Sequence, residues 1–358
     1  MLARRSKLTH NGLVFDLPML IPSFSSKGSA YEVKKKRLKY AVAGDLRDFG
    51  NLPGKALLVS AYDLYFNHLD ITEKNGGRAT AINSLRNASI VFVDSGGYEL
   101  ADSFDSCEPK VPPHIPADSN CEYTEVTYRA VIARLAKAKS LPPLALANFD
   151  HGSKGLAVVD QVTAAKNLFG DFQQCITSFI IKPWGKKRTT VDPEELTDKD
   201  AASLRAFDIV GVTEKELGLY LWERLKRIAS LRQKLDRAKV QAPLQIWGGL
   251  DPVITPLYFF AGASIFDGVS WLRYGYVNGL AVSQHSFQIL EPRLSVTHDR
   301  TRARGSMTLY NRTALERLEL ALQSWVDYDG QDWSMFDPAV RDALRGAYEA
   351  MKTQIEGV

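Results

Sequence analysis

The chain has 358 residues, 45% of them hydrophobic and 24% charged, and its formal net charge is +4. These proportions are ordinary for a soluble globular protein, and the slight basic excess permits a polyanionic partner without requiring one. The 3 cysteines are widely spaced, which points to a reducing compartment and away from disulfides or structural zinc. Without a Walker A loop, a dinucleotide fingerprint or a G-x-S-x-G elbow, those nucleotide-binding and hydrolase classes lose support. No apolar run reaches about 18 residues and no signal-peptide pattern is present, so we expect a soluble cytoplasmic protein without membrane contact.

Short apolar runs alternate with helix-like segments along the chain. The runs occupy residues 17–24, 55–62, 89–96, 144–152, 176–185, 207–214, 244–252 and 264–271. Segments with helical periodicity lie between most of them, for example 124–140 and 219–239. Apolar strands that alternate with helices predict a parallel sheet covered on both sides. Eight such units favour a closed TIM-type (β/α) barrel over an open sheet.

The last part of the chain has a helical pattern, with its best amphipathic stretch at residues 312–326. Barrels of this class reach the length of this chain as single domains. We therefore expect an α/β fold with a barrel domain over residues 1–306 and extra helices over 307–358 packed on it.

In such a barrel the chemistry lies at the carboxyl ends of the strands. The residues expected there are Asp94, Asp150, Lys182, the turn 211–214, Gly248, Gly249 and Asp267. The run 90–93 leads directly into Asp94, a Ser-Gly-Gly turn and Tyr98, which combines a carboxylate with an aromatic face. Each aspartate taken singly fits a helix N-cap equally well, and each glycine pair fits an ordinary turn. Three aspartates on one rim nevertheless make a candidate catalytic site.

Several of these segments resemble motifs of the tRNA-guanine transglycosylase family. DSGGYEL (94–100) looks like the family's D-S-G-G-[FY]-Q motif, and ASIFDGVSWLRYG (263–275) resembles its G-[IV]-D-x-F-D segment. Weaker counterparts are QIWGGLDP (245–252), IVGVTEKELG (209–218), ANFDHG (147–152) and LLVSAYDLY (57–65). The stronger matches follow the family's order over about residues 90–275, and the resemblance implies the same eight-stranded barrel.

The resemblance implies base exchange at a guanosine of a nucleic acid. By position, Asp267 would be the nucleophile that attacks C1′ and forms a covalent glycosyl-enzyme, and Asp94 would be the general acid/base. Asp150 would accept hydrogen bonds from the purine, and Tyr98 would stack on it. The other base-binding positions carried over are Ser95, Gly97, Lys182, Gly211, Val212, Glu214, Gly248 and Gly249.

The sequence departs from the family pattern in ways that alter recognition. The tRNA enzymes carry a zinc site of three cysteines and a histidine near their end, whereas no cysteine follows Cys175 here. One glutamine of the family's motifs is replaced by Glu99, and another by Lys182 or Pro183. The asparagine and the histidine of the N-T-Y-H-L segment are replaced by Ser60 and Asp63. The catalytic pair is retained. By elimination, this pattern favours the DNA-modifying relatives that insert 7-deazaguanine bases.

A nucleic-acid substrate calls for cationic contacts to phosphates. The basic segments are residues 34–39, 182–188 and 301–305. The second follows a predicted strand end and interleaves an aromatic residue with cations, so we expect backbone contacts from Lys186, Lys187, Arg188 and also Arg273. The alternative for each segment is a solvated surface loop.

We therefore expect a glycosyltransferase (a pentosyltransferase) that exchanges guanine in DNA for a 7-deazaguanine base of the preQ0 type, with no cofactor and no metal. Its partners would be DNA and the free base, and a helper ATPase or a dimer partner is compatible with this function. The alternatives are a tRNA-guanine transglycosylase acting on tRNA, a non-catalytic nucleic-acid-binding paralogue, and an unrelated barrel enzyme for a small sugar or nucleotide. The last predicts no salt-dependent binding to nucleic acid.

Overall fold

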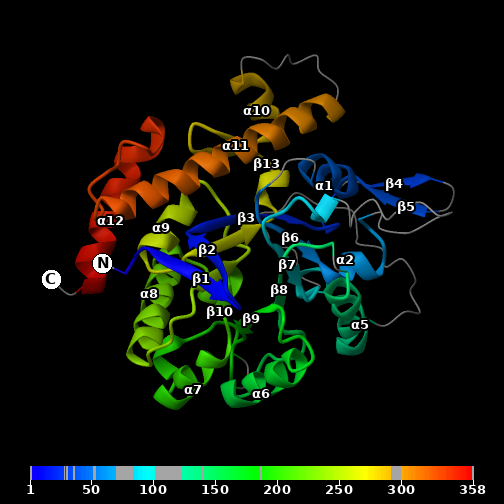
Figure 1. Cartoon of the computed structure of the whole chain (residues 1–358). Helices are drawn as coiled ribbons and strands as arrows, with labels where there is room; N and C mark the ends of the chain where they lie inside the picture. The colour runs from blue at the N-terminus through cyan, green and yellow to red at the C-terminus, as the bar shows by residue number, and fades with distance from the viewer. Residues whose placement is uncertain are drawn as a thin grey trace. The chain divides into compact units, whose positions relative to one another are not determined.

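The computed structural model describes residues 2–27, 29, 31–34, 37–50, 54–69, 84–100, 123–138, 140–185, 188–291 and 300–356. Eight parallel strands form a closed barrel in the order β10-β11-β12-β3-β6-β7-β8-β9 (Figure 1). They are β3 (Met19–Phe24), β6 (Leu57–Ser60), β7 (Val91–Asp94), β8 (Leu144–Ala147), β9 (Ile176–Ile181), β10 (Ile209–Thr213), β11 (Leu244–Trp247) and β12 (Ile265–Gly268). Each strand lies inside one of the apolar runs, so the predicted TIM-type barrel is confirmed.

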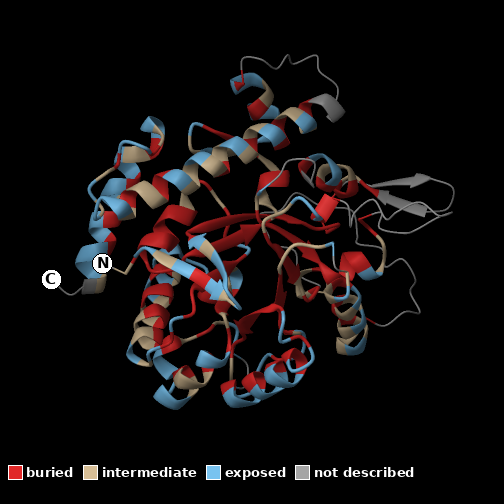
Figure 2. Cartoon of the chain, viewed as in Figure 1, coloured by how far each residue is buried: buried red, intermediate tan, exposed pale blue. Residues whose placement is uncertain are grey.

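The barrel strands are made almost wholly of buried residues. Every position of β3, β6, β8, β9, β11 and β12 is buried, and Figure 2 shows these strands in red. Strands of a parallel barrel are covered on both faces, which explains why they are continuous apolar runs and not alternating patterns. Charged residues are therefore confined to strand ends, where Asp94 closes β7 and Asp267 is the penultimate residue of β12.

The chain divides into two compact units. The first unit comprises Met1–Pro22, Gly155–Val162 and Phe179–Val358, and the second comprises Ser23–Lys154 and Thr163–Ser178. Strands β10, β11 and β12 belong to the first unit, and β6, β7 and β8 to the second.

The helices of the first unit include α7 (Asp198–Ser203), α8 (Leu221–Arg237), α9 (Ile254–Phe260), α10 (Gln284–Leu290), α11 (Arg300–Asp327) and α12 (Pro338–Glu356). The extra C-terminal helices are thus present, and the expected boundary between residues 306 and 307 falls inside α11. An aromatic cluster joins α9, α11 and α12. In it the ring of Trp325 lies 4.4 Å from Phe260 and 5.2 Å from Tyr348, measured between centroids.

The first unit also contains two hairpins that the sequence analysis did not identify. One joins β1 (Ser6–His10) to β2 (Leu13–Leu17), and the other joins β13 (Tyr274–Val277) to β14 (Leu280–Ser283). Both turns are Asn-Gly pairs with positive φ at both residues: 48° and 82° at Asn11 and Gly12, 52° and 73° at Asn278 and Gly279. This is the two-residue hairpin turn that Asn-Gly favours.

The second unit carries shorter elements. Its helices are α1 (Val42–Gly50), α2 (Ala61–Tyr65), α4 (Gly97–Leu100) and α5 (Glu125–Ala136), and its hairpin pairs β4 (Tyr31–Lys34) with β5 (Arg37–Tyr40). Helix α6 (Val158–Phe169) begins in the first unit and ends in the second. Within the part of the chain that the structure describes, no helix has the length and apolarity needed to cross a membrane.

Asn311 of α11 supports the first prediction. It is fully buried, its Oδ1 accepts a hydrogen bond from Tyr276 N at 2.6 Å, and its Nδ2 donates to the carbonyl oxygens of Trp271 and Tyr274. We expect Asn311→Ala to lower the free energy of unfolding by about 3 kcal/mol, because three buried backbone groups lose their partner. Leu309→Ala, at an exposed position of the same helix, should cost less than about 0.5 kcal/mol. Urea unfolding measures both, and equal losses would contradict this role of Asn311.

Candidate active site

The DSGGY turn of the second unit brings several of the predicted residues together. Asp94 accepts a hydrogen bond from Ser95 N at 2.8 Å through Oδ1, and the Ser95 hydroxyl donates to Asp150 Oδ1 at 2.6 Å. A Cβ at Gly97 would lie 2.9 Å from the same Asp150 oxygen. A side chain at Gly97 would push against the Asp150 carboxylate. Asp94, Ser95, Gly97 and Asp150 form one cluster.

Lys27 is a member of this cluster that the sequence analysis missed. It follows the end of β3, is 3% exposed, and donates from Nζ to the carbonyl oxygen of Tyr98 at 2.6 Å. The same ammonium lies 4.6 Å from the centroid of the Tyr98 ring, a distance at which a cation is attracted to an aromatic face. The Lys27 ammonium thus lies over one face of the Tyr98 ring.

Glu99, the residue after Tyr98, is a buried carboxyl group with unusual proton affinity. Its two oxygens accept hydrogen bonds from the hydroxyls of Ser25 and Ser60, the latter at 2.8 Å. Burial, followed by the negative charge of Asp63, raises its pKa to about 7, while the two serine hydrogen bonds act in the opposite direction. This side chain therefore exchanges a proton near neutral pH.

Asp63 anchors the loop after β3. Its Oδ2 accepts from Ser26 N at 2.7 Å, and its Oδ1 lies 2.5 Å from Ser26 Oγ and 3.0 Å from His68 Nδ1. Asp63 is fully buried. The carboxylate ties the loop that carries Ser25 and Lys27 to α2, so its role is to position the residues that contact Glu99 and Tyr98.

The first unit holds Asp267 in a fixed orientation. Its Oδ2 accepts from Gln245 Nε2 at 2.8 Å, and its Oδ1 accepts from Gly248 N at 3.3 Å. Asp267 is 4% exposed. These two donors fix the orientation of the Asp267 carboxyl group. An oriented carboxylate at a strand end is suited to nucleophilic attack.

Glycines of β10 and of the turn after β11 make room for neighbouring side chains. A Cβ at Gly249 would lie 2.7 Å from Ile246 Cγ2, and one at Gly211 would lie 2.5 Å from Trp247 Nε1. Gly211 pairs with Gln245 in the β10–β11 ladder, and Val212 pairs with Ile246. Gly248 therefore lies at the Asp267 carboxylate and Gly211 at the Trp247 indole, whereas Gly249 lies against Ile246 and Tyr258.

Two other predicted base-binding residues have protein partners. Lys182 Nζ lies 3.0 Å from Glu216 Oε2, with both side chains buried. Glu214 Oε1 accepts from the Tyr258 hydroxyl at 2.7 Å and pairs with Arg224 at 3.0 Å. These ion pairs link strand ends to neighbouring helices, so a base that used either residue would have to share it.

Only some of the residues predicted to contact phosphates lie in the described part of the chain. Lys186 and Lys187 lie outside the described residues. Arg188 forms an exposed ion pair with Glu195, and Arg273 follows the short 3-10 helix Ser270–Leu272 after β12. An exposed pair contributes little stability and leaves the guanidinium open to exchange of partners.

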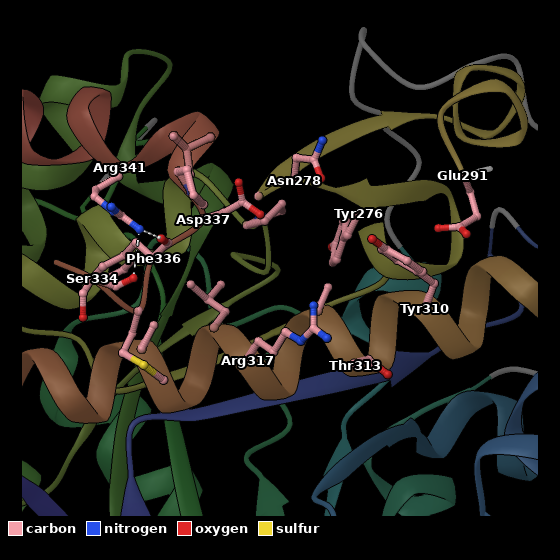
Figure 3. Close-up of a pocket in the computed structure, with 18 of the residues that line it drawn as sticks. Tyr276, Asn278, Glu291, Tyr310, Thr313, Arg317, Ser334, Phe336, Asp337 and Arg341 are labelled. Carbon is pink, nitrogen blue, oxygen red and sulfur yellow. Dashed lines mark hydrogen bonds between the residues drawn. The ribbon is translucent and has the colours of Figure 1, made fainter. Parts of the chain in front are cut away.

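A separate cavity of about 730 Å³ lies in the first unit, between the β13–β14 hairpin, α11 and α12 (Figure 3). Tyr276, Tyr310 and Arg317 contribute to its lining, and Arg341 donates to the carbonyl oxygens of Ser334 and Phe336 at its edge. None of the predicted site residues lines it. Among the described residues no group of His, Cys, Asp and Glu side chains is arranged to hold a metal ion.

No model of a known protein family matches the chain, and no curated protein matches it.

The raised pKa of Glu99 makes the second prediction. A carboxyl group that titrates near 7 when folded and at its ordinary 4.5 when unfolded stabilises the fold below about pH 4.5, and this contribution is lost as the pH rises through 7. Glu99→Gln removes that dependence. The unfolding free energy of the variant, relative to the wild type, should therefore rise by up to about 3 kcal/mol between about pH 5 and pH 8.

Glu125→Gln is the matched control, because Glu125 makes only a half-exposed i,i+4 pair with Arg129. Denaturant unfolding at several pH values measures all three proteins. A difference between Glu99→Gln and the wild type that stays constant over this range would contradict the raised pKa.

Proposed function

We propose that the protein is a nucleic-acid guanine transglycosylase that exchanges guanine in DNA for a 7-deazaguanine base. The observation that carries the proposal is Asp267, a buried carboxylate at the end of β12 whose oxygens accept from Gln245 and Gly248. Further support comes from the cluster at the DSGGY turn, where Asp94, Ser95 and Asp150 share hydrogen bonds. A barrel with acids at its strand ends is a common frame for sugar chemistry.

In the proposed reaction Asp267 attacks C1′ of the target nucleotide. The C1′–N9 bond breaks, its electron pair goes to the guanine, and Asp94 donates a proton to the departing base. The product of this half-reaction is an ester between the Asp267 oxygen and C1′. The incoming base then gives a proton to Asp94 and attacks C1′, which releases the Asp267 carboxylate with net retention of configuration.

The remaining residues of the DSGGY cluster serve recognition in this proposal. Asp150 accepts from the N–H edge of the purine, and the Ser95 hydroxyl keeps its carboxylate oriented. Tyr98 stacks on the base. Extrusion of the target guanine from a duplex costs a few kcal/mol, which stacking and these hydrogen bonds offset.

DNA is favoured over tRNA because the chain has no cysteine after Cys175 and so lacks the cysteine cluster with which the tRNA enzymes support tRNA docking. The replacement of the motif glutamine by Glu99 points the same way, since a carboxyl group and a carboxamide present different hydrogen-bonding groups to the incoming base. Both changes alter recognition and leave the catalytic pair in place.

The third prediction is incorporation of labelled guanine by the purified protein, offered duplex DNA and tRNA side by side. We expect label in DNA only. Asp267→Asn should abolish incorporation because it removes the nucleophile, and Asp94→Asn should reduce it at least about 100-fold because it removes the general acid. Asp171→Asn, at an exposed aspartate, should match the wild type.

Label in tRNA would identify the tRNA enzyme and overturn the choice of polymer. Full activity of either active-site variant would remove the role assigned to that residue. Salt-dependent DNA binding without incorporation would favour a non-catalytic nucleic-acid-binding protein.

A further inference from the structure

Trp247, the last residue of β11, carries a buried hydrogen-bond donor next to Gly211 of β10. The side chain is 6% exposed, and its Nε1–H has no acceptor among the residues that the structure describes. An amide or indole N–H that is buried without a partner destabilises the fold, and most buried polar groups in native structures have a hydrogen-bond partner. This donor therefore calls for an explanation.

The indole lies on the same side of the sheet as the Asp267 carboxylate. Ile246 is adjacent to Gly249, and Gly249 also lies near Tyr258 of α9, so Ile246 faces the outer, helix-covered side of β11. Because successive strand residues face opposite sides, Gln245 and Trp247 face the inner side. Gln245 confirms this direction, since its side chain reaches Asp267.

Three N–H donors lie on β11 or in the turn after it, and they differ in whether they have an acceptor within the described chain. Gln245 Nε2 and Gly248 N both donate to the Asp267 carboxylate. Trp247 Nε1 lies over Gly211. A Cβ built at residue 211 would be 2.5 Å from this nitrogen, so the indole can occupy this position only because residue 211 is a glycine. The Trp247 donor is thus the group of this cluster that has not been satisfied within the described chain.

Trp325 provides an internal comparison. Its Nε1–H also lacks an acceptor among the described residues, and its side chain is fully buried. Trp325 however lies in the aromatic cluster, with ring centroids of Trp333 and Tyr348 at 5.8 and 5.2 Å. Rings at these distances offer π faces to an N–H group. Trp247 makes no ring contact with any described residue, so the explanation that serves Trp325 does not serve Trp247.

We propose that Trp247 Nε1–H donates a hydrogen bond to a sugar or phosphate oxygen of the nucleotide on which Asp267 acts. This inference rests on the proposed function, in which Asp267 bonds to C1′ of that nucleotide. Oxygens of the sugar and of its phosphates surround C1′ within a few bonds. A donor on the same side of β11 as Gln245, which contacts Asp267, can hold these oxygens in the orientation for attack. Trp247 is therefore a binding residue for the backbone of the target nucleotide, and the purine is held by other groups.

The direct test is the indole N–H signal of Trp247 in the full-length ¹⁵N-labelled protein. The chain has 6 tryptophans, and the Trp247 signal is assigned by its loss in Trp247→Phe and by its proximity to the Gly211 Hα. Two probes separate the possible acceptors: duplex DNA with one tetrahydrofuran abasic site, which offers sugar and phosphate oxygens but no base at the target position, and free guanine. We expect a downfield proton shift of the Trp247 signal with the abasic duplex and no shift with guanine.

A shift with guanine alone would place the acceptor on the base and overturn the assignment to the backbone. An unmoved Trp247 signal, with other signals reporting that the duplex is bound, would overturn the inference and leave the proposed function standing. Absence of binding by either probe would remove both.

Kinetics of base exchange supply an independent readout. Trp247→Phe keeps a large aromatic ring and loses the N–H, so the KM for DNA should rise about tenfold while the KM for the free base is unchanged. Trp325→Phe is the matched control and should leave both constants as in the wild type. An unchanged KM for DNA in a folded Trp247→Phe protein contradicts the inference, whereas wild-type protein without exchange activity contradicts the proposed function itself.

Discussion

Burial of the barrel strands on both faces is the constraint on which the rest of the molecule depends. A strand covered on both sides admits few polar groups, since each needs a partner in an environment without water. Gln245 inside β11 donates its amide to Asp267, and Lys182, just past the end of β9, is paired with Glu216. The strand ends are where carboxylates can be both rigidly held and reachable. Asp94 and Asp267 each occupy such an end, which makes each of them a candidate for reaction chemistry.

Hydrogen bonds hold these carboxylates and their neighbours in fixed orientations. Ser95 fixes Asp150, Gly248 and Gln245 fix Asp267, and Asp63 fixes the loop that carries Lys27. Glu99 is the exception in electrostatic terms, because burial and Asp63 raise its pKa to about 7. A requirement for stability alone would disfavour a carboxyl group at this buried position. Its presence, one residue after Tyr98, fits a group retained for recognition or proton exchange.

The sequence predicts the barrel well because each strand is a continuous apolar run bounded by turn residues, a signal that does not depend on distant contacts. The two Asn-Gly hairpins were missed, although Asn11-Gly12 and Asn278-Gly279 carry a strong local signal. The partners of Glu99 could not be predicted in the same way. Ser25 is 74 residues away in the chain, and the pairing arises only because β3 and β7 both flank β6. Trp247 was overlooked for a related reason: an unsatisfied N–H becomes visible only when all its neighbours are known.

The most direct test of the central claim is the mass of the intact protein after incubation with guanine-containing duplex DNA and acid quenching. A double displacement through Asp267 predicts a covalent DNA–protein adduct that carries an abasic sugar, with peptide mapping to Asp267 and no adduct in Asp267→Asn. The adduct should disappear when excess free base is added before the quench, because the second displacement releases the enzyme. Base exchange without any adduct at Asp267, or an adduct that persists in Asp267→Asn, would contradict this mechanism.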